Sequence, residues 1–571
     1  MAERRDYNKW TKQGLVERVK ALEAELAQRT ADVGAAEAHA LPPAPPPVKA
    51  AVAVAEAEAE AEAEAEAEQG ADKPPLKKKR KKDFDAANYS TRLIALKLAY
   101  LGKNYNGFEV QAHGDRTTIE EELWKALVTS FLIFPKNPDE VDFSICEYSK
   151  CGRTDRGVSA FGQVIGLRVR SNKPVPKPKA AVLEGDEGAQ PPSETPAEAE
   201  TAGGAADDVP FPIEREVEYC RVLNRLLPPD IRILAWCPSP PPGFSARFSC
   251  RERQYRYFFT QPAFAPMPTD LEGPRPEGRS KDGWLDIEAM REAARLFVGE
   301  HDFRNFCKVD PNKQITNFTR RIFDADVVEV PDARTALPYL RRLDLRPDGL
   351  NPDDAPKVYS FNVRGSAFLW HQIRHMVAIL FLVGQGLERP ELVAQLLDAA
   401  THPRRPAYVL AEETPLVLWD CVFPDEDDAE RRDALGWVWV GDDSQLHLHG
   451  RAGLMDHLWR GWRERKMDEV LAARLLGYVA ERVDGAEGTT LRAGEKREPS
   501  QRLFDGGNAP KLAGRYVPVL RKPLLPAPDD VNDKFARQKG FADSQAMRAT
   551  GNWREAVRAA KAAEAAAGKV G

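Results

Sequence analysis

A short glycine-bounded loop that leads into an alternating segment constrains the fold of this chain most. Residues 151–164 are Cys-Gly-Arg-Thr-Asp-Arg-Gly-Val-Ser-Ala-Phe-Gly-Gln-Val, so two glycines enclose Asp155 and two arginines. Glycine permits backbone angles and close approaches that other residues resist. Residues 164–169 alternate as a strand does. The pattern predicts a tight loop that presents Asp155 at a sheet edge, although by itself it also fits a surface turn with a solvated ion pair.

The chain around this loop alternates strands with helices in two similar units. The elements expected in the first unit are strands 91–100, 164–170 and 231–236 and helices 118–132, capped by Thr117 or Thr118, and 214–227. Those expected in the second unit are helices 286–298 and 367–384 and strands 320–330 and 357–364. This order predicts an α+β fold whose two halves pack about a cleft.

The length and composition of the chain limit the kind of protein that it can be. The chain has 571 residues, enough for two or more domains, and a formal net charge of −6 that comes largely from low-complexity segments. No apolar stretch approaches the roughly 20 residues that span a bilayer, so a soluble intracellular protein is expected. The seven cysteines are scattered, odd in number and without a Cys-x-x-Cys pair, which argues against a disulfide frame or a structural zinc site.

The first 88 residues are expected to lie outside the folded body. Residues 1–30 contain a short amphipathic helix, which could pair two copies into a homodimer or fold on a partner. Residues 31–75 are rich in Ala, Pro and Glu and are expected to be disordered. The basic cluster 77–82 indicates a nuclear import signal, with an RNA-backbone patch or a solvated charge run as alternatives. We expect a protein of nucleus and cytoplasm.

Residues 244–259 interleave four arginines with six aromatic residues. In a strand, Arg253, Tyr255 and Tyr257 would share one face. Cations for phosphates and aromatic rings for bases are what RNA binding requires. A half-buried strand whose arginines extend to solvent remains the alternative.

The apolar helix expected at 367–384 carries His371 and His375 one turn apart. A zinc protease would need glutamate where the chain has Gln372, so the metalloprotease interpretation fails. Arg374 is more informative, because a guanidinium in an apolar helix is costly unless a carboxylate pairs with it. Asp155 is the expected partner.

The segments 152–155 and 157–160 resemble the catalytic motif of the A-type tRNA pseudouridine synthases, in which the aspartate is the nucleophile. Ser159, where the family usually has histidine, resembles the eukaryotic branch that acts on tRNA positions 38 and 39. The resemblance extends, in motif order, over residues 89–170, 211–260 and 284–422. It implies two ferredoxin-like halves in one curved mixed sheet with a central catalytic cleft, and tRNA as the partner.

The resemblance also implies a domain layout and residue roles. The halves would span 89–260, with a disordered insertion at 172–210, and 261–424, followed by a partly helical extension at 425–571. Asp155 would be the nucleophile and Arg374 would contact it. Arg153 would fill the space left by the flipped nucleotide or hold that nucleotide. Tyr255 would stack on the uracil and help to remove its C5 proton.

The isomerisation needs no redox partner or group donor, so no cofactor is expected, and the sequence has no phosphate-binding glycine loop. Two alternatives remain: a sister synthase acting on other tRNA positions, and a catalytically idle RNA-binding protein on the same scaffold. The presence of Asp155, Tyr255 and Arg374 favours the enzyme, because an idle relative would be free to lose the carboxylate.

Overall fold

The computed structural model describes residues 89–111, 114–175, 211–266, 280–330, 357–424, 434–442, 445–450, 453–484, 502–512 and 514–567. The chain divides into two compact parts, Met1–Phe84 and Asp85–Gly571, and every described residue belongs to the second part, which also contains both of the strand-and-helix units expected from the sequence. The expected N-terminal helix, the basic cluster and all but the first residues of the 172–210 insertion lie outside these ranges. Within them, no helix combines the length and apolar character that crossing a membrane requires.

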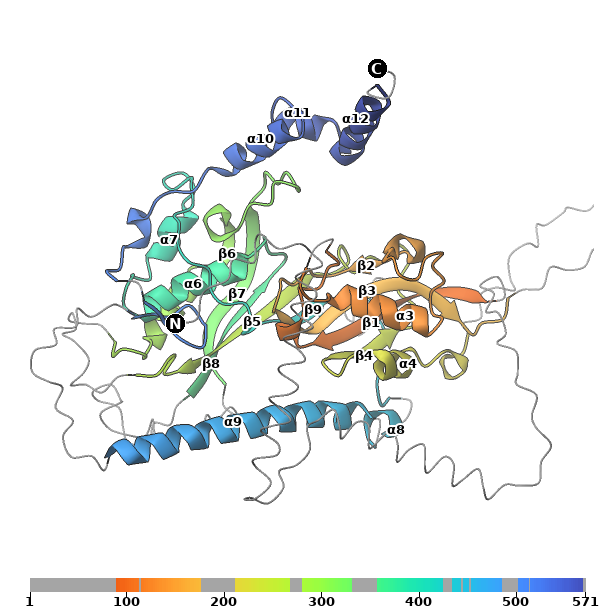
Figure 1. Ribbon diagram of the computed structural model, residues 1–571, viewed down its shortest axis with the longest axis horizontal. Helices are drawn as coiled ribbons and strands as arrows, with labels where there is room; N and C mark the ends of the chain where they lie inside the picture. The colour runs from red at the N-terminus through yellow and green to blue at the C-terminus, as the bar shows by residue number, and fades with distance from the viewer. Residues whose placement is uncertain are drawn as a thin grey trace, which may run out of the picture. The chain divides into compact units, whose positions relative to one another are not determined.

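One mixed sheet of ten strands forms the centre of the described part of the chain (Figure 1). Its order is β10-β4-β1-β3-β9-β5-β8-β7-β6, and β2 pairs with β3 beside this path. The strands are β1 (Ser90–Tyr100), β2 (Ser149–Lys150), β3 (Ser159–Ser171), β4 (Ile231–Cys237), β5 (Glu252–Gln261), β6 (Gly299–Asp302), β7 (Thr319–Glu329), β8 (Lys357–Gly365), β9 (Leu416–Val422) and β10 (Val438–Trp439).

Strand β9 joins the two parts of the sheet. It pairs in parallel with β3 through Ser159 and Val417, and antiparallel with β5 through Arg253 and Cys421. The other strand pairs are antiparallel. Strand β9 therefore lies between the strands of the first strand-and-helix unit and those of the second.

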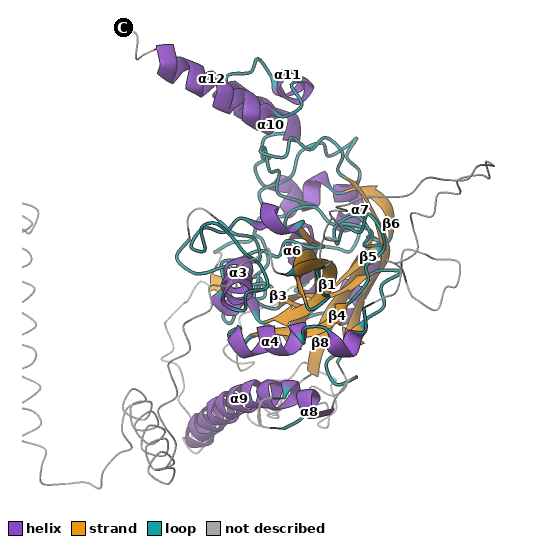
Figure 2. Ribbon diagram, turned by 90° about the vertical axis from the view of Figure 1, so that its right-hand side faces the viewer, coloured by secondary structure: helices purple, strands orange, loops and turns teal. Residues whose placement is uncertain are grey.

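Two hydrophobic cores lie against the two parts of the sheet. The first core packs β1, β3 and β4 against α3 (Ile119–Thr129) and α4 (Tyr219–Leu226). The second packs β5, β7 and β8 against α5 (Ile287–Arg295), α6 (Gln372–Gly384) and α7 (Leu392–Leu397). Figure 2 shows α3, α4, α6 and α7 beside the strands. Tyr255 packs against both cores, so β5 lies where they meet.

Capping and local backbone conformation explain where three of the helices begin. Thr118 caps α3, because its side chain accepts a hydrogen bond from the Glu121 amide while the Glu121 carboxylate accepts from the Thr118 amide. The helix expected at 367–384 begins only at Gln372, because His371 has φ 61° and ψ 10°, a left-handed conformation that cannot continue a helix. The helix expected at 214–227 is shortened to α4, because Glu216 is extended.

The chain after β9 packs back onto both cores and also forms further helices. Residues 434–442 add β10 to the sheet edge, and Leu435 enters the first core. Phe504, just after β11 (Arg502–Leu503), which pairs with β12 (Lys511–Leu512), enters the second core. The remaining α-helices of the described residues are α8 (Gln445–Leu448), α9 (Leu454–Asp484), α10 (Pro528–Gln538), α11 (Ser544–Ala549) and α12 (Trp553–Ala567), so this extension is partly helical.

Candidate active site

The loop that carries Asp155 is held by hydrogen bonds to the end of β1 and the turn after it. The Tyr100 hydroxyl lies 2.7 Å from the Thr154 Oγ1 atom, and the Phe108 amide donates to the Thr154 carbonyl at 3.1 Å. Gly157 has φ 79°, which other residues rarely adopt. A Cβ at Gly107 would lie 2.9 Å from the Thr154 carbonyl oxygen. The glycines therefore allow the close approach that the sequence predicted.

The buried side chain of Gln163 forms hydrogen bonds with the backbone at the start of this loop. The Gly152 amide donates to Gln163 Oε1 at 3.0 Å, and Gln163 Nε2 donates to the Gly152 carbonyl at 2.9 Å. The Gly102 amide donates to Ser159 Oγ at 3.0 Å. Ser159, the residue that suggested the eukaryotic branch, thus joins β3 to the turn after β1. These contacts fix the loop backbone before any ligand binds.

The carboxylate of Asp155 contacts two side chains from the segment that precedes α6. Trp370 Nε1 donates to Asp155 Oδ1 at 3.0 Å, and His371 Nε2 lies 3.4 Å from Asp155 Oδ2. The Asp155 side chain is 27% exposed. A loop of the first unit therefore meets the start of a helix of the second unit, and Asp155 remains open to solvent at their contact.

Arg374 has a different partner from the one the sequence suggested. Its Nη2 atom lies 2.6 Å from Glu413 Oε2, and its Nε atom donates to the Ala411 carbonyl at 2.8 Å. The contacts that the described residues make include no direct ion pair between Arg374 and Asp155. The expected pairing is wrong because the 411–413 segment, just before β9, brings a nearer carboxylate. A Cβ at Gly157 would lie 2.8 Å from Glu413 Cγ, so Glu413 also packs against the Asp155 loop.

Burial dominates the electrostatics of Asp155. It raises the pKa of this carboxyl above its usual value, and the negative charge of Glu413 raises it further. The Trp370 hydrogen bond and the positive charge of Arg374 act in the opposite direction. Arg374 therefore favours the ionised form of Asp155 through space, but burial outweighs this effect in the free protein.

The two histidines form a neutral hydrogen-bonded chain. Burial lowers the pKa of both imidazoles to about 3. Arg405 Nη1 lies 2.7 Å from His375 Nε2, and because arginine can only donate, His375 Nε2 must accept. His375 Nδ1 therefore carries the proton and donates to the His371 carbonyl at 2.9 Å. This chain supports the left-handed backbone of His371 beside Asp155.

Trp370 and His371 were not predicted as site residues. From the sequence, His371 was considered only as a metal ligand, and Trp370 lay within the helix expected at 367–384. A signal was present, since two rings with N–H groups stand together before Gln372 in an otherwise apolar segment. Their proximity to Asp155 depends on how the two units pack, which local sequence does not encode.

Arg153 lies in the loop and Tyr255 in β5, and neither bonds to the Asp155 carboxylate. The side chain of Arg153 is 48% exposed and lies 3.1 Å from Glu109 Oε1. Tyr255, in β5, makes an edge-to-face contact with Phe368 at 5.2 Å between ring centroids. Burial raises the pKa of the Tyr255 phenol, which therefore stays protonated at neutral pH. Among described residues, no hydrogen bond or ion pair links either side chain to Asp155.

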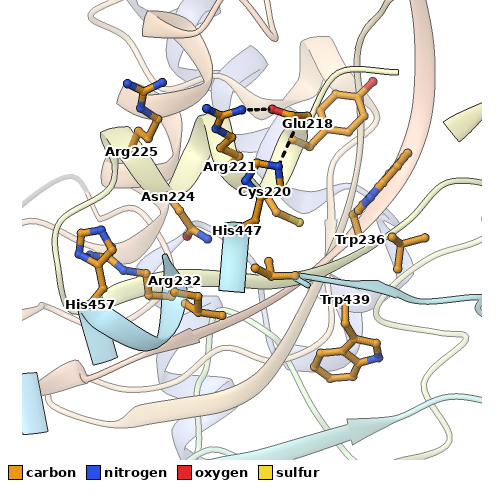
Figure 3. Close-up of a pocket in the computed structure, with 14 residues that line it drawn as sticks. Glu218, Cys220, Arg221, Asn224, Arg225, Arg232, Trp236, Trp439, His447 and His457 are labelled. Atoms are coloured by element: carbon orange, nitrogen blue, oxygen red, sulfur yellow. Dashed lines mark hydrogen bonds and ion pairs between the residues drawn. The ribbon is translucent and has the colours of Figure 1, made fainter. Parts of the chain in front are cut away.

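A cavity of about 350 Å³ lies between α4, β4, β10 and the start of α9 (Figure 3). Its lining includes Arg221, Arg225, Arg232, His447 and His457. None of the four residues predicted for the site lines it. This cavity is therefore distinct from the surroundings of Asp155.

Comparison with known proteins identifies similar chains. Residues 293–424 match the family described as tRNA pseudouridine synthase. The chain is 40% identical over 351 residues to the tRNA pseudouridine(38/39) synthase of Saccharomyces cerevisiae, covering 61% of this chain and 62% of that protein. It is 40% identical to the protein of the same name from Homo sapiens, covering 60% of this chain and 58% of the relative.

A more distant relative is covered more fully. The tRNA pseudouridine synthase A of Methanothrix thermoacetophila is 30% identical over 342 residues, which cover 59% of this chain and 86% of that protein. By contrast, the matched part of this chain spans about 60% of the length of the yeast and human relatives.

Proposed function

This chain belongs to the tRNA pseudouridine synthase family, and on that premise we propose that it converts uridine to pseudouridine at positions 38 and 39 of the tRNA anticodon stem-loop. The observation that carries the proposal is the placement of Asp155, a partly exposed carboxylate on a braced loop, held by Trp370 and His371 where the two units meet. The names of the yeast and human relatives support the two positions.

In the proposed reaction Asp155 attacks the target nucleotide as its carboxylate. The glycosidic bond breaks, the uracil turns, and C5 bonds to the sugar as the Asp155 carboxylate is released. The C5 proton leaves while N1 gains a proton, so no atom is gained or lost overall. The attacking oxygen must be ionised, and the Trp370 N–H group stabilises that form. His371 is neutral, so it orients the carboxylate without forming a charged pair.

The target base must leave the stem to reach Asp155. Arg153 is half exposed, and among the described residues its side chain is held by a surface ion pair with Glu109, which is weak enough to let it move into the vacated space or hold the flipped nucleotide. Tyr255 would stack on the uracil and assist loss of the C5 proton. Its place between the two cores supports a fixed ring position.

Other parts of the proposal concern architecture and location. The two units, each with its own core, would be ferredoxin-like halves, and the tRNA would lie across the sheet with the catalytic cleft between them. A homodimer through the N-terminal helix and a distribution over nucleus and cytoplasm stay predictions from sequence.

The test is pseudouridine mapping on an unmodified tRNA with uridines at 38 and 39. The wild type is expected to convert both positions, and Asp155→Ala to convert neither while binding the tRNA within several-fold. Asp115→Ala serves as a matched control, because Asp115 is an exposed carboxylate that contacts Arg156 rather than Asp155, and it should retain activity.

Two results would redirect the proposal. Conversion at other uridines would assign the chain to a sister branch of the family. If the wild type binds several tRNAs and converts none, the idle RNA-binding alternative takes its place.

A further inference from the structure

Three cysteines from distant parts of the sequence meet beneath the Asp155 loop. Cys151 directly precedes the loop, Cys250 lies just before β5, and Cys421 is in β9. Their sulfur atoms all lie within 4.8 Å of one another. The three residues, which we call the thiol cluster, are 6%, 7% and 2% exposed.

Backbone hydrogen bonds place the three residues of the thiol cluster. The Cys151 amide donates to the Val164 carbonyl at 2.9 Å, which anchors it to β3. The Arg251 amide donates to the Val422 carbonyl at 2.8 Å, so the residues after Cys250 and Cys421 are joined. The backbone pairing of one sheet therefore brings the cluster together, and it does not require a bound ion to assemble.

The guanidinium of Arg253 lies beside the thiol cluster. Arg253 donates to four carbonyl oxygens, those of Ser366 at 2.8 Å, Arg247 at 2.7 Å, Cys250 at 3.4 Å and Cys151 at 3.5 Å. All four acceptors are neutral, so they do not balance the guanidinium charge. A cation beside cysteines favours the thiolate, the form that binds metals.

We propose that the thiol cluster binds one thiophilic metal ion with a filled d shell, Zn²⁺ in first place, through three thiolates. A Zn–S bond of about 2.3 Å places tetrahedral sulfurs about 3.8 Å apart, within reach of small side-chain shifts from the observed separation. Binding releases the thiol protons to solvent. The charges of three thiolates, one Zn²⁺ ion and the Arg253 guanidinium add up to zero. With Cu⁺ in place of Zn²⁺, the same groups carry one net negative charge.

The ion would join the Asp155 loop to β5 and β9, the strands at the centre of the sheet. It would therefore stabilise the junction of the two units, and this consequence is independent of the reaction at Asp155. The opposing interpretation is that the three cysteines are only small apolar packing residues, as buried cysteines often are.

The test measures metal binding by the full chain. Reduced protein is stripped with a chelator and titrated with Zn²⁺ against a chromophoric competitor, and separately with Cu⁺ without oxygen. One ion per chain and a higher Tm are expected. Cys151→Ser, Cys250→Ser and Cys421→Ser should each weaken binding by more than about tenfold, the loss that even an outer-sphere partner causes. Cys307→Ser, a buried cysteine outside the cluster, should bind as the wild type does.

X-ray absorption on the loaded wild type decides the matter even if the variants fail to fold. Three sulfurs in the first shell of zinc support the proposal. The same shell around Cu⁺, with weaker binding of Zn²⁺, supports the thiolate site and overturns the choice of zinc. A wild type that binds neither ion, a shell of nitrogen and oxygen, or unchanged affinity in Cys421→Ser overturns the site.

Discussion

The indole of Trp370 donates a 3.0 Å hydrogen bond to the carboxylate of Asp155, across 215 positions of sequence. Trp370 is itself positioned, because the Lys308 ammonium lies 4.4 Å from its ring centroid and the Lys308 amide donates to its carbonyl at 2.9 Å. This contact joins the loop of the first unit to the segment before α6 in the second. It holds one carboxylate oxygen and leaves the other beside His371.

Replacing Trp370 by phenylalanine should keep the ring and remove the donor. A hydrogen bond to a charged group contributes about 1.5–3 kcal/mol, so kcat/KM should fall by roughly 10- to 150-fold. The acidic limb of the pH profile should also move to higher pH, because the bond lowers the pKa of Asp155. Initial rates from pH 5 to 8 test this. Trp419→Phe, in β9, is the control, and equal profiles for both variants would contradict the role of Trp370.

Replacing Asp155 by asparagine should abolish activity and raise stability at neutral pH. Burial raises the pKa of Asp155 above 3.8, so the folded state disfavours the charge that the wild type carries at pH 7. The associated stability is present below the unfolded pKa and is lost as pH rises through the folded pKa. Thermal unfolding at pH 7 should show a higher Tm for the variant than for the wild type. This difference in Tm should become smaller as the pH is lowered toward about 4. A lower Tm at pH 7 would contradict this account.

Replacing Arg374 by methionine should leave Glu413 without its ion partner. We expect a loss of about 1–3 kcal/mol in the free energy of unfolding, the cost of an unsatisfied partly buried charge. Adding Glu413→Gln should recover part of this stability. Activity should stay low in both variants, because Asp155 loses the positive charge that favours its ionised form. Urea unfolding and single-turnover rates check the two effects, and full recovery of activity in the double variant would argue against an electrostatic role.

Replacing His371 by glycine should separate stability from activity. Glycine adopts φ 61° without the penalty of about 1–2 kcal/mol that a side chain meets, so the fold should be retained. Turnover should fall, because the imidazole beside Asp155 is lost.

The same variant tests the pH dependence. The folded pKa of His371 is about 3, below its unfolded value, so the wild type should lose stability as pH falls from about 6.5 toward 3. Urea unfolding at pH 7 and pH 5 should show a smaller loss in His371→Gly. An unchanged slope would place the titrating group elsewhere.

Deleting residues 76–83 removes the basic cluster and leaves the folded body intact. Activity in vitro should be unchanged, and the protein should shift toward the cytoplasm. Microscopy of a tagged full chain and of the deletion measures this. Unchanged nuclear accumulation would contradict the import interpretation.

The sequence alone determined the features that depend on near neighbours in the chain. Periodicity located β1, β4, β7 and β8, the Thr118 cap defined the start of α3, and the glycines around Asp155 indicated its tight loop. The resemblance of the loop to a family motif was also visible there. These signals are local because hydrogen bonding within an element and the angles of a turn depend on a few adjacent residues.

The tertiary structure alone decided which distant side chains meet. It paired Arg374 with Glu413, brought Trp370 and His371 to Asp155, and gathered Cys151, Cys250 and Cys421 into one cluster. No spacing in the chain predicts these contacts, because the partners stand on separate elements. Their distances follow from the register of β9 between β3 and β5 and from the packing of two cores on one sheet.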